Sequence, residues 1–204
     1  MSRPRLPVGD VGHLPTHAFH NRDMMWWGTV SFIAIEGFTL VLTATVYVYL
    51  RKNFSTWPPE GIARPDLVAP SVLVALMLAS LPLMRMIDRA SRAHDLMRVR
   101  HLLTVATVVS LAFNLLRIWE LTQSLNVRWD TNAYGSAQWL VLGAHGTLLL
   151  MQYVETLGMT LIFWRGPVEK KHFSDASDVA GYWFFIVLSW LPLYLLCFWG
   201  PRWF

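Results

Sequence analysis

Five long apolar segments, separated by short polar or turn-forming stretches, dominate the hydrophobic pattern of this 204-residue chain. A helix needs about 20 predominantly apolar residues to cross the hydrocarbon core of a bilayer. Five segments meet that requirement, and they cover residues 26–50, 67–87, 99–123, 136–164 and 179–200. The pattern therefore predicts an all-α, polytopic membrane protein with five transmembrane helices.

Helix-breaking stretches separate these segments and set the limits of the predicted helices. The first connection contains a Trp-Pro-Pro-Glu-Gly sequence at residues 57–61, and the fourth segment ends at Arg165-Gly166-Pro167. Clusters of proline and glycine are typical of turns and loops. Neither a soluble domain nor an internal repeat is evident. We therefore expect a flexible cytoplasmic tail over residues 1–25, followed by one membrane domain over residues 26–204.

The composition fits a chain whose surroundings are largely lipid. Hydrophobic residues make up 54% of the chain and charged residues only 15%, whereas charged residues make up about 25% of an ordinary soluble domain. The chain also has 11 tryptophans, and tryptophan favours membrane–water interfaces. Its basic residues lie at the ends of the apolar segments rather than in one patch, so nucleic-acid binding is not expected.

The distribution of lysine and arginine predicts which way the helices cross the membrane. With five spans, the N-terminal tail and the second and fourth connections share one side. That side carries Arg3, Arg5, Arg22, Arg85, Arg89, Arg92, Arg98, Arg100, Arg165, Lys170 and Lys171. The other side carries only Arg51, Lys52, Arg64, Arg128 and Arg202. Because basic residues accumulate on the cytoplasmic side, we expect the N-terminus inside and the C-terminus outside.

Ionisable residues within the spans are the candidates for a polar site, because a charged group in the middle of a membrane helix is costly. Glu36 lies about ten residues into the first span, which at about 1.5 Å per residue is near mid-membrane. His145 lies at a similar depth in the fourth span, which enters from the opposite side. Two interpretations stay open: a buried contact between Glu36 and His145, or separate polar partners for each.

Arg117 and Glu120 lie three positions apart near the outer end of the third span and can pair on one helix face. We expect this pair to neutralise itself and to reach the interface by snorkelling. Glu155 lies toward the inner end of the fourth span. Gln152 shares a helix face with His145, which indicates a polar seam between packed helices.

These residues do not form a recognisable catalytic or haem centre. A membrane b-type cytochrome needs axial ligands from facing helices, and His145 is the only histidine deep in a span. No buried serine has an evident base, which argues against an intramembrane protease. At most weak metal binding is expected from the three histidines of the tail, His13, His17 and His20. Glycines along the fourth span instead favour close helix packing.

Several short motifs follow one another in an order that a known family shares. They are Ile35-Glu36-Gly37-Phe38, Trp57-Pro58-Pro59-Glu60-Gly61-Ile62, Arg100-His101, Leu115-Leu116-Arg117-Ile118-Trp119-Glu120, Tyr134-Gly135-Ser136, Gly143-Ala144-His145-Gly146 and Tyr182-Trp183. From about Trp27 to the C-terminus, the chain resembles subunit III of the haem–copper oxidases, of the cytochrome c oxidase type. The shared order and spacing carry this resemblance, and five spans correspond to the five-helix bacterial form.

The chain also departs from the family pattern, which indicates a divergent member. Leu148 stands where the family commonly has a second histidine. Phe184 and Val187 stand where the last helix commonly has a histidine and an aspartate, and Arg117 replaces a frequent glutamine. The polar positions that match the family are Glu36, Glu120 and His145.

The resemblance implies a subunit without a catalytic centre, packed with oxidase subunits I and II in a bacterial inner (plasma) membrane. Haem and copper would belong to those partner subunits. The family is held to bind phospholipid and to support proton uptake and the stability of the catalytic subunit in aerobic respiration. Glu36, His145, Glu120 and Arg117 would form a lipid-binding or structural polar site. The alternatives are a subunit III-like accessory of a quinol oxidase or nitric oxide reductase, and a small stand-alone transporter.

Overall fold

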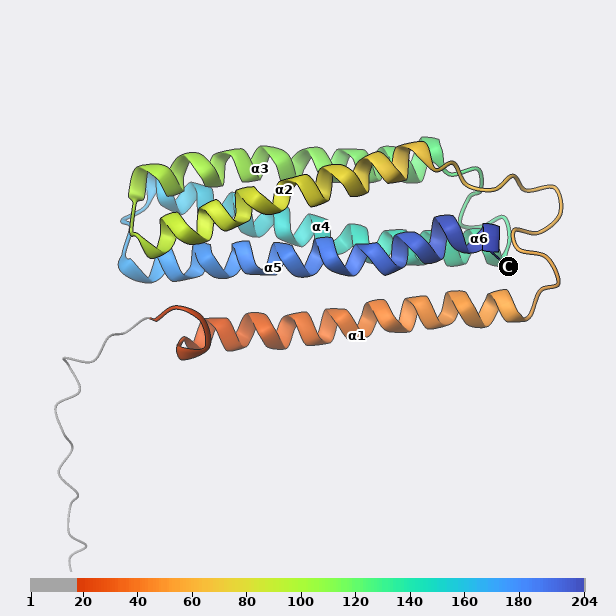
Figure 1. Cartoon of the computed structure of the whole chain (residues 1–204), viewed down its shortest axis with the longest axis horizontal. Helices are drawn as coiled ribbons and strands as arrows, with labels where there is room; N and C mark the ends of the chain where they lie inside the picture. The colour runs from red at the N-terminus through yellow and green to blue at the C-terminus, as the bar shows by residue number, and fades with distance from the viewer. Residues whose placement is uncertain (1–17, 204) are drawn as a thin grey trace, which may run out of the picture.

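Five long helices make up most of the computed structural model, which describes residues 18–203 and has no strand among them. They are α1 Met24–Lys52, α2 Val68–Arg92, α3 Leu96–Trp119, α4 Ala133–Arg165 and α5 Lys170–Tyr194. The five run alternately in opposite directions (Figure 1). Each lies in a helical segment long and apolar enough to cross a bilayer. The predicted all-α fold with five membrane-spanning helices is confirmed.

Four short helical elements extend the long ones. The 3-10 helix η1 His20–Arg22 precedes α1, and the short helix α6 Gly200–Trp203 ends the described chain. Two π-helical turns, η2 Glu120–Ser124 and η3 Leu195–Trp199, continue α3 and α5. Most of the tail predicted over residues 1–25, including His13 and His17, lies outside the described residues, so its flexibility stays a prediction.

Helices α2, α3, α4 and α5 form a ring in which each packs against its two neighbours. Helix α1 lies outside this ring, against α4 and α5 (Figure 1). Large buried side chains such as Met77, Leu103 and Trp183 fill the centre of the ring. Ile35 and Phe38, in contrast, lie exposed on the outer face of α1. An apolar exterior suits a helix whose surroundings are lipid or another membrane helix.

Helix α5 begins at Lys170, nine residues before the predicted last span. Its first turns are amphipathic: Phe173 and Ala176 are buried, while Lys170 is exposed. A prediction based on continuous apolar runs misses such turns, because only one face of the helix is apolar. The backbone N–H of Glu169 donates to Nδ1 of His172 at 2.9 Å, which helps to fix where the helix starts.

The Trp-Pro-Pro loop folds back onto the end of the bundle between α1 and α2. Trp57 is buried, and its indole N–H donates to the hydroxyl of Tyr47 at 3.0 Å. Its ring packs edge-on against Tyr134, with 5.0 Å between the ring centroids. This tryptophan therefore ties the end of α1 to the start of α4.

Three polar side chains of α4, seven positions apart, interact with backbone carbonyl groups of α5 and of η3, which continues it. Seven residues are nearly two turns, so the three lie on one face of α4. The pairs are Gln138 with Cys197 O at 3.0 Å, His145 with Ile186 O at 3.0 Å, and Gln152 with Val179 O at 3.3 Å. The predicted polar seam through Gln152 and His145 is confirmed, and it extends to Gln138.

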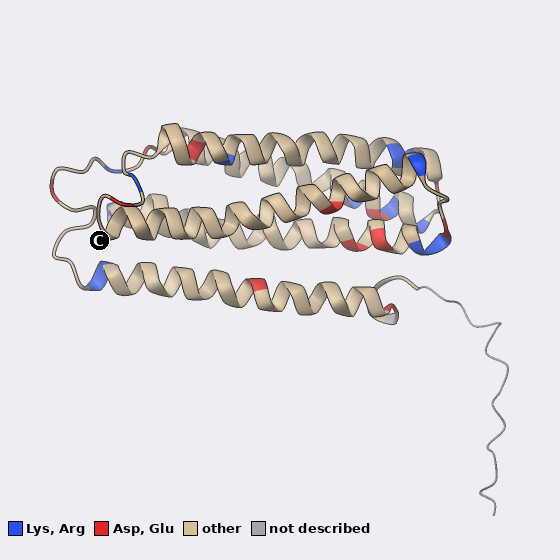
Figure 2. Ribbon diagram, turned by 180° about the vertical axis from the view of Figure 1, so that it is seen from behind, with Lys and Arg blue, Asp and Glu red and all other residues tan. Residues whose placement is uncertain are grey.

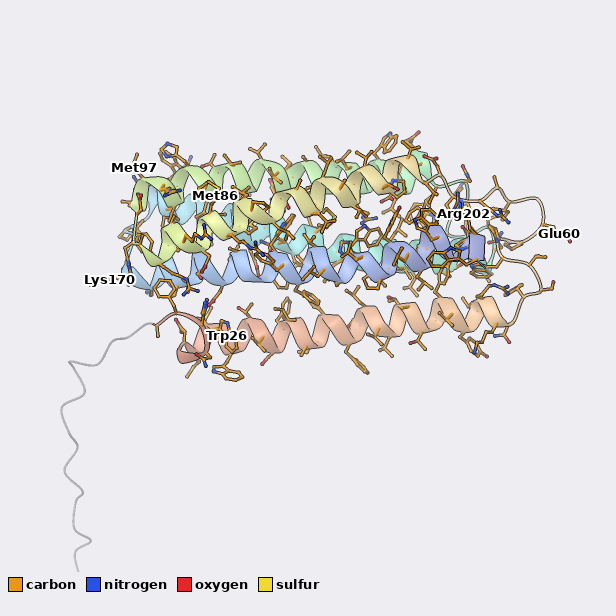
Figure 3. All side chains as sticks on the ribbon, in the orientation of Figure 1. Trp26, Glu60, Met86, Met97, Lys170 and Arg202 are labelled. Atoms are coloured by element: carbon orange, nitrogen blue, oxygen red, sulfur yellow. The ribbon has the colours of Figure 1, made fainter. Side chains whose placement is uncertain are left out.

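Charged residues lie mainly toward the two ends of the bundle, with few between them (Figure 2). Trp26, Met97 and Lys170 lie at the end where α1, α3 and α5 begin, whereas Glu60 and Arg202 lie at the opposite end (Figure 3). The second and fourth connections therefore share an end with the start of α1, as the predicted orientation requires. Which end faces the cytoplasm stays a prediction from the charge count.

Candidate functional site

The most enclosed group of ionisable side chains lies between α3, α4 and α5. Arg117 and Glu120 are each 2% exposed, and His145 is 0% exposed. Arg117 and Glu120 form an ion pair, so the predicted pairing three residues apart is confirmed. The prediction that they snorkel to the interface is wrong, because both side chains lie inside the bundle. Position near the end of a span does not decide which face of the helix a residue occupies.

Arg117 also reaches across to α4. Its Nη2 lies 3.3 Å from Nδ1 of His145, and Nε2 of the same ring lies 3.0 Å from the carbonyl oxygen of Ile186 on α5. A guanidinium only donates and a carbonyl only accepts. Both contacts are satisfied together when the imidazole carries its single proton on Nε2, an assignment inferred from the network. The arginine and the histidine thus connect three helices.

Trp190 of α5 covers the same group. The guanidinium carbon of Arg117 lies 3.9 Å from the centroid of the Trp190 ring. The centroids of the His145 and Trp190 rings lie 4.6 Å apart, with 33° between the ring planes. A guanidinium over an indole face gains a cation–π attraction that is strongest where water is absent. Within the described chain, Nε of Arg117 and Oε1 of Glu120 have no hydrogen-bond partner.

Gly146 gives the side chain of Arg117 room beside α4. A Cβ atom at position 146 would lie 3.2 Å from Cγ of Arg117, closer than an ordinary contact. A Cβ at Gly135 would lie only 2.2 Å from a backbone carbonyl oxygen of the preceding loop. Added Cβ atoms at Gly143 and Gly158 would meet nothing within 4 Å. The close helix packing expected from the glycines of α4 therefore occurs at Gly146, whereas Gly135 packs against the preceding loop.

Glu36 of α1 forms a separate polar contact. The hydroxyl of Tyr182 on α5 donates to its carboxylate. His145 is bonded instead to Arg117 and Ile186, so the direct contact between Glu36 and His145 is not formed and the interpretation with separate partners is correct. Their partners on α5, Tyr182 and Ile186, lie one helical turn apart. Glu36 and His145 therefore lie at a similar depth although they do not touch each other. Depth alone could not give their direction around each helix.

The sequence indicated four residues of these two polar groups, Glu36, Arg117, Glu120 and His145, but not their aromatic partners. Tyr182 and Trp190 lie on the last helix, four positions before and after Ile186, whose carbonyl receives His145. Buried tyrosine and tryptophan usually find a polar partner for the O–H or N–H group. This tendency predicts that Tyr182 and Trp190 each contact a polar group, but it does not predict which residue supplies that group.

A cavity of about 500 Å³ lies between α1, α4 and α5. Much of its wall is apolar and includes Phe32, Met159 and Ile162. Tyr182, the partner of Glu36, lines it as well. Its volume is within the range of ligand-binding pockets. In contrast, no group of three or more His, Cys, Asp or Glu side chains in residues 18–203 is placed to hold a metal ion.

The chain is similar to two curated proteins of one kind, although no family model matches it. A cytochrome c oxidase subunit 3 from Synechocystis sp. (strain ATCC 27184 / PCC 6803 / Kazusa) is 25% identical over 191 residues, covering 89% of this chain and 78% of that protein. A cytochrome c oxidase subunit 3 from Thermostichus vulcanus is 22% identical over 187 residues, covering 89% and 90%. These similarities support the resemblance to a divergent subunit III that the motif order indicated.

Proposed function

We propose that this chain, a divergent relative of cytochrome c oxidase subunit III, is the non-catalytic subunit III of a haem–copper terminal oxidase. The observation that carries the proposal is the similarity to two proteins of that name over 89% of the chain. The five apolar helices and the same relatives support a multi-pass protein of the bacterial plasma membrane.

In this proposal the partners are oxidase subunits I and II, which hold the haem and copper of the complex. The outer surface of the bundle offers apolar helix faces for such partners, including Ile35 and Phe38 on α1 and Val108 on α3. Membrane helices associate through close packing of faces of this kind. The names of the two relatives favour the cytochrome c oxidase type over an accessory of a quinol oxidase or nitric oxide reductase.

The proposed role is to support proton uptake, to bind phospholipid and to stabilise the catalytic subunit. The cavity beside Tyr182 supports the lipid part, because its largely apolar wall suits an acyl chain. The contacts among Arg117, Glu120, His145 and Trp190 join three helices of this chain into one unit. In the proposal, this unit stabilises the catalytic subunit by packing against it.

Co-purification tests the proposal most directly. With an affinity tag on this chain in its native host, we expect a haem-containing subunit to be retained in mild detergent. The isolated chain is expected to show no Soret absorption, because the haem belongs to the partner. A Soret band from the chain alone, or the absence of any haem-containing partner, would contradict the proposed role.

A further inference from the structure

A buried carboxylate lies between two cavities, near the end of the bundle where α1 and α5 begin. Asp178 of α5 is 8% exposed, and within residues 18–203 its Oδ2 atom has no hydrogen-bond partner. It lines the cavity of about 500 Å³ between α1, α4 and α5. It also lines a second cavity of about 340 Å³ between α1, α2 and α5. A buried carboxylate that is neither paired nor hydrogen-bonded is costly.

Among the described residues, the charged groups that act on Asp178 are Asp23, Asp88 and Asp175, which are all acidic and so do not relieve this cost. Asp88 already accepts hydrogen bonds from Arg92 at 3.0 Å and from a serine of α5 at 2.5 Å. Asp178 therefore lies near other carboxylates, and no described cation pairs with it.

The basic residues of the second cavity are engaged elsewhere. Arg92 pairs with Asp88 and also bonds to His20. The guanidinium carbon of Arg85 lies 5.6 Å from the centroid of the Phe184 ring. Neither arginine forms a hydrogen bond or an ion pair with Asp178, so neither of them satisfies this carboxylate.

The ionisable residues that line the larger cavity, between α1, α4 and α5, are acidic. Glu155, Asp175 and Asp178 line it, and among the described residues of its lining there is no lysine, arginine or histidine. Lys171 and His172 act electrostatically on Asp175, but they do not belong to the cavity wall. Low-dielectric walls increase the attraction between such carboxylates and a cation. The charge of the lining thus selects for a positively charged group.

Two glycines, which have no side chain beyond a hydrogen atom, leave room within this cavity. Gly28 of α1 and Gly158 of α4 both line it, and an added Cβ at either position would meet nothing within 4 Å. These glycines keep the space open beside Asp178. They also provide a way to fill the cavity without changing its charge.

The remaining walls define the rest of the ligand. Phe32, Met159 and Ile162 are apolar and would leave a small hydrated ion poorly matched. The described carboxylates are not grouped as a metal site either. A primary ammonium group offers three N–H donors and a positive charge to the carboxylate oxygens. An attached hydrocarbon part would satisfy the apolar walls.

We propose that the cavity between α1, α4 and α5 binds the primary ammonium group of an amphiphile, with Asp178 as the main acceptor. Asp175 and Glu155 add negative charge around the ammonium group, and the apolar walls hold the adjoining hydrocarbon. An aminophospholipid headgroup and a free long-chain amine share this chemistry. The inference rests on the proposed lipid binding and specifies which headgroup chemistry the chain prefers.

Lipid retention tests this preference. The complex, purified with its partner subunits, is placed in nanodiscs containing equal amounts of phosphatidylethanolamine, phosphatidylglycerol and phosphatidylcholine. Lipids that remain after detergent extraction are counted by native mass spectrometry. We expect enrichment of phosphatidylethanolamine, and a loss of about tenfold in its retention in Asp178→Asn, because a charge-assisted hydrogen bond is removed. Asp130→Asn, at an exposed ion pair, is the matched control and should retain the wild-type pattern.

A steric variant separates the ligand site from a general effect on folding. Gly158→Leu should fill the cavity and lower phosphatidylethanolamine retention while its carboxylates stay in place. Thermal unfolding of both variants checks that the bundle remains folded. If Asp178→Asn fails to fold, Gly158→Leu still decides whether the cavity holds the lipid, because unchanged retention in this variant would overturn the assignment.

Dodecylamine and dodecanol distinguish the sources of the amine. Dodecylamine that binds through Asp178 while phosphatidylethanolamine is not retained would support a free amine as ligand and overturn the lipid part of the proposed function. Equal or greater retention of phosphatidylglycerol would overturn the ammonium inference and leave the proposed lipid binding intact. Binding of dodecanol as tight as that of dodecylamine would also overturn the ammonium inference. If neither lipid nor amine binds, both proposals fail.

Discussion

Arg117 is the residue whose surroundings most constrain the bundle. It is buried, paired with Glu120, bonded to His145 and placed over Trp190. A charge in such a place is tolerated only when its partners remain, because removing one partner of a buried pair leaves the other charge uncompensated. Replacing one member of the Arg117–Glu120 pair should therefore lower the free energy of unfolding more than replacing both.

We predict that Glu120→Ala destabilises the protein by about 3–5 kcal/mol, because it leaves the Arg117 charge buried without its carboxylate. The double variant Arg117→Met with Glu120→Leu should lose less stability than Glu120→Ala alone, since no charge is left behind. Thermal or denaturant unfolding of the chain in detergent measures both. Asp130→Ala, at the exposed pair with Arg128, is the control and should change stability by less than about 1 kcal/mol. A double variant less stable than the single one would contradict the prediction.

Glu36 and Tyr182 form the other buried polar contact, between α1 and α5. Glu36→Ala is expected to change the bound-lipid content or the rate of turnover-dependent inactivation more than the initial rate of oxygen reduction. Tyr182→Phe removes only the hydroxyl and should act in the same direction. Oxygen uptake and lipid analysis of the assembled oxidase measure the effect. Initial turnover that falls to zero in a fully assembled complex would rule out a supporting role.

At the scale of the helices, polar residues on one face of α4 and a glycine beside α3 set the position of this helix. Gln138, His145 and Gln152 donate hydrogen bonds to backbone carbonyls of α5 and of its continuation η3. Gly146 makes room for Arg117 from α3. Hydrogen bonds to backbone carbonyls depend on the axial position of two helices rather than on the sequence of the second. The seam therefore fixes how far α4 is shifted along α5.

We predict that Gly146→Ala is less stable than Gly143→Ala by about 1 kcal/mol or more, because overpacking strains a buried contact. The added Cβ at position 146 would crowd Cγ of Arg117 at 3.2 Å, whereas the one at position 143 meets nothing within 4 Å. The intrinsic gain in helix propensity is the same for both substitutions, so their difference isolates the contact. Unfolding of the two variants under identical conditions measures it, and equal stabilities would refute the role assigned to Gly146.

At the scale of the whole molecule, the end of the bundle where α1 begins has more basic residues beside it than the opposite end, and the sides are apolar. The second and fourth connections lie at the end where α1 begins (Figures 2 and 3), and they are flanked by eight basic residues, Arg85, Arg89, Arg92, Arg98, Arg100, Arg165, Lys170 and Lys171. In a bilayer this arrangement favours that end on the cytoplasmic side. The cavity with Asp178 lies toward the same end, so its amine ligand would come from the inner leaflet.

Cysteine labelling tests this orientation. Cys197 is the only cysteine and is fully buried, so a membrane-impermeant maleimide should give little background. We predict that Glu60→Cys is labelled in spheroplasts, whose plasma membrane is intact. His94→Cys should be labelled only after the plasma membrane is permeabilised. The opposite pattern would show that the N-terminus lies outside.

The sequence by itself determined the number of helices, their approximate limits and the residues that could not be left unpaired. Long apolar segments and the turns between them are local properties, and Glu36, Arg117, Glu120 and His145 stand out because charge is costly in lipid. The Arg117–Glu120 pair was also predictable, since three positions on one helix bring side chains together.

Only the tertiary structure decided which partner each polar residue meets. Glu36 and His145 lie at similar depths, yet α5 supplies Tyr182 to one and a backbone carbonyl to the other. Arg117 turns inward to His145 rather than outward to the interface. Depth follows from counting residues along one chain segment. Direction depends on how each helix is rotated about its axis, and packing against all neighbouring helices sets that rotation.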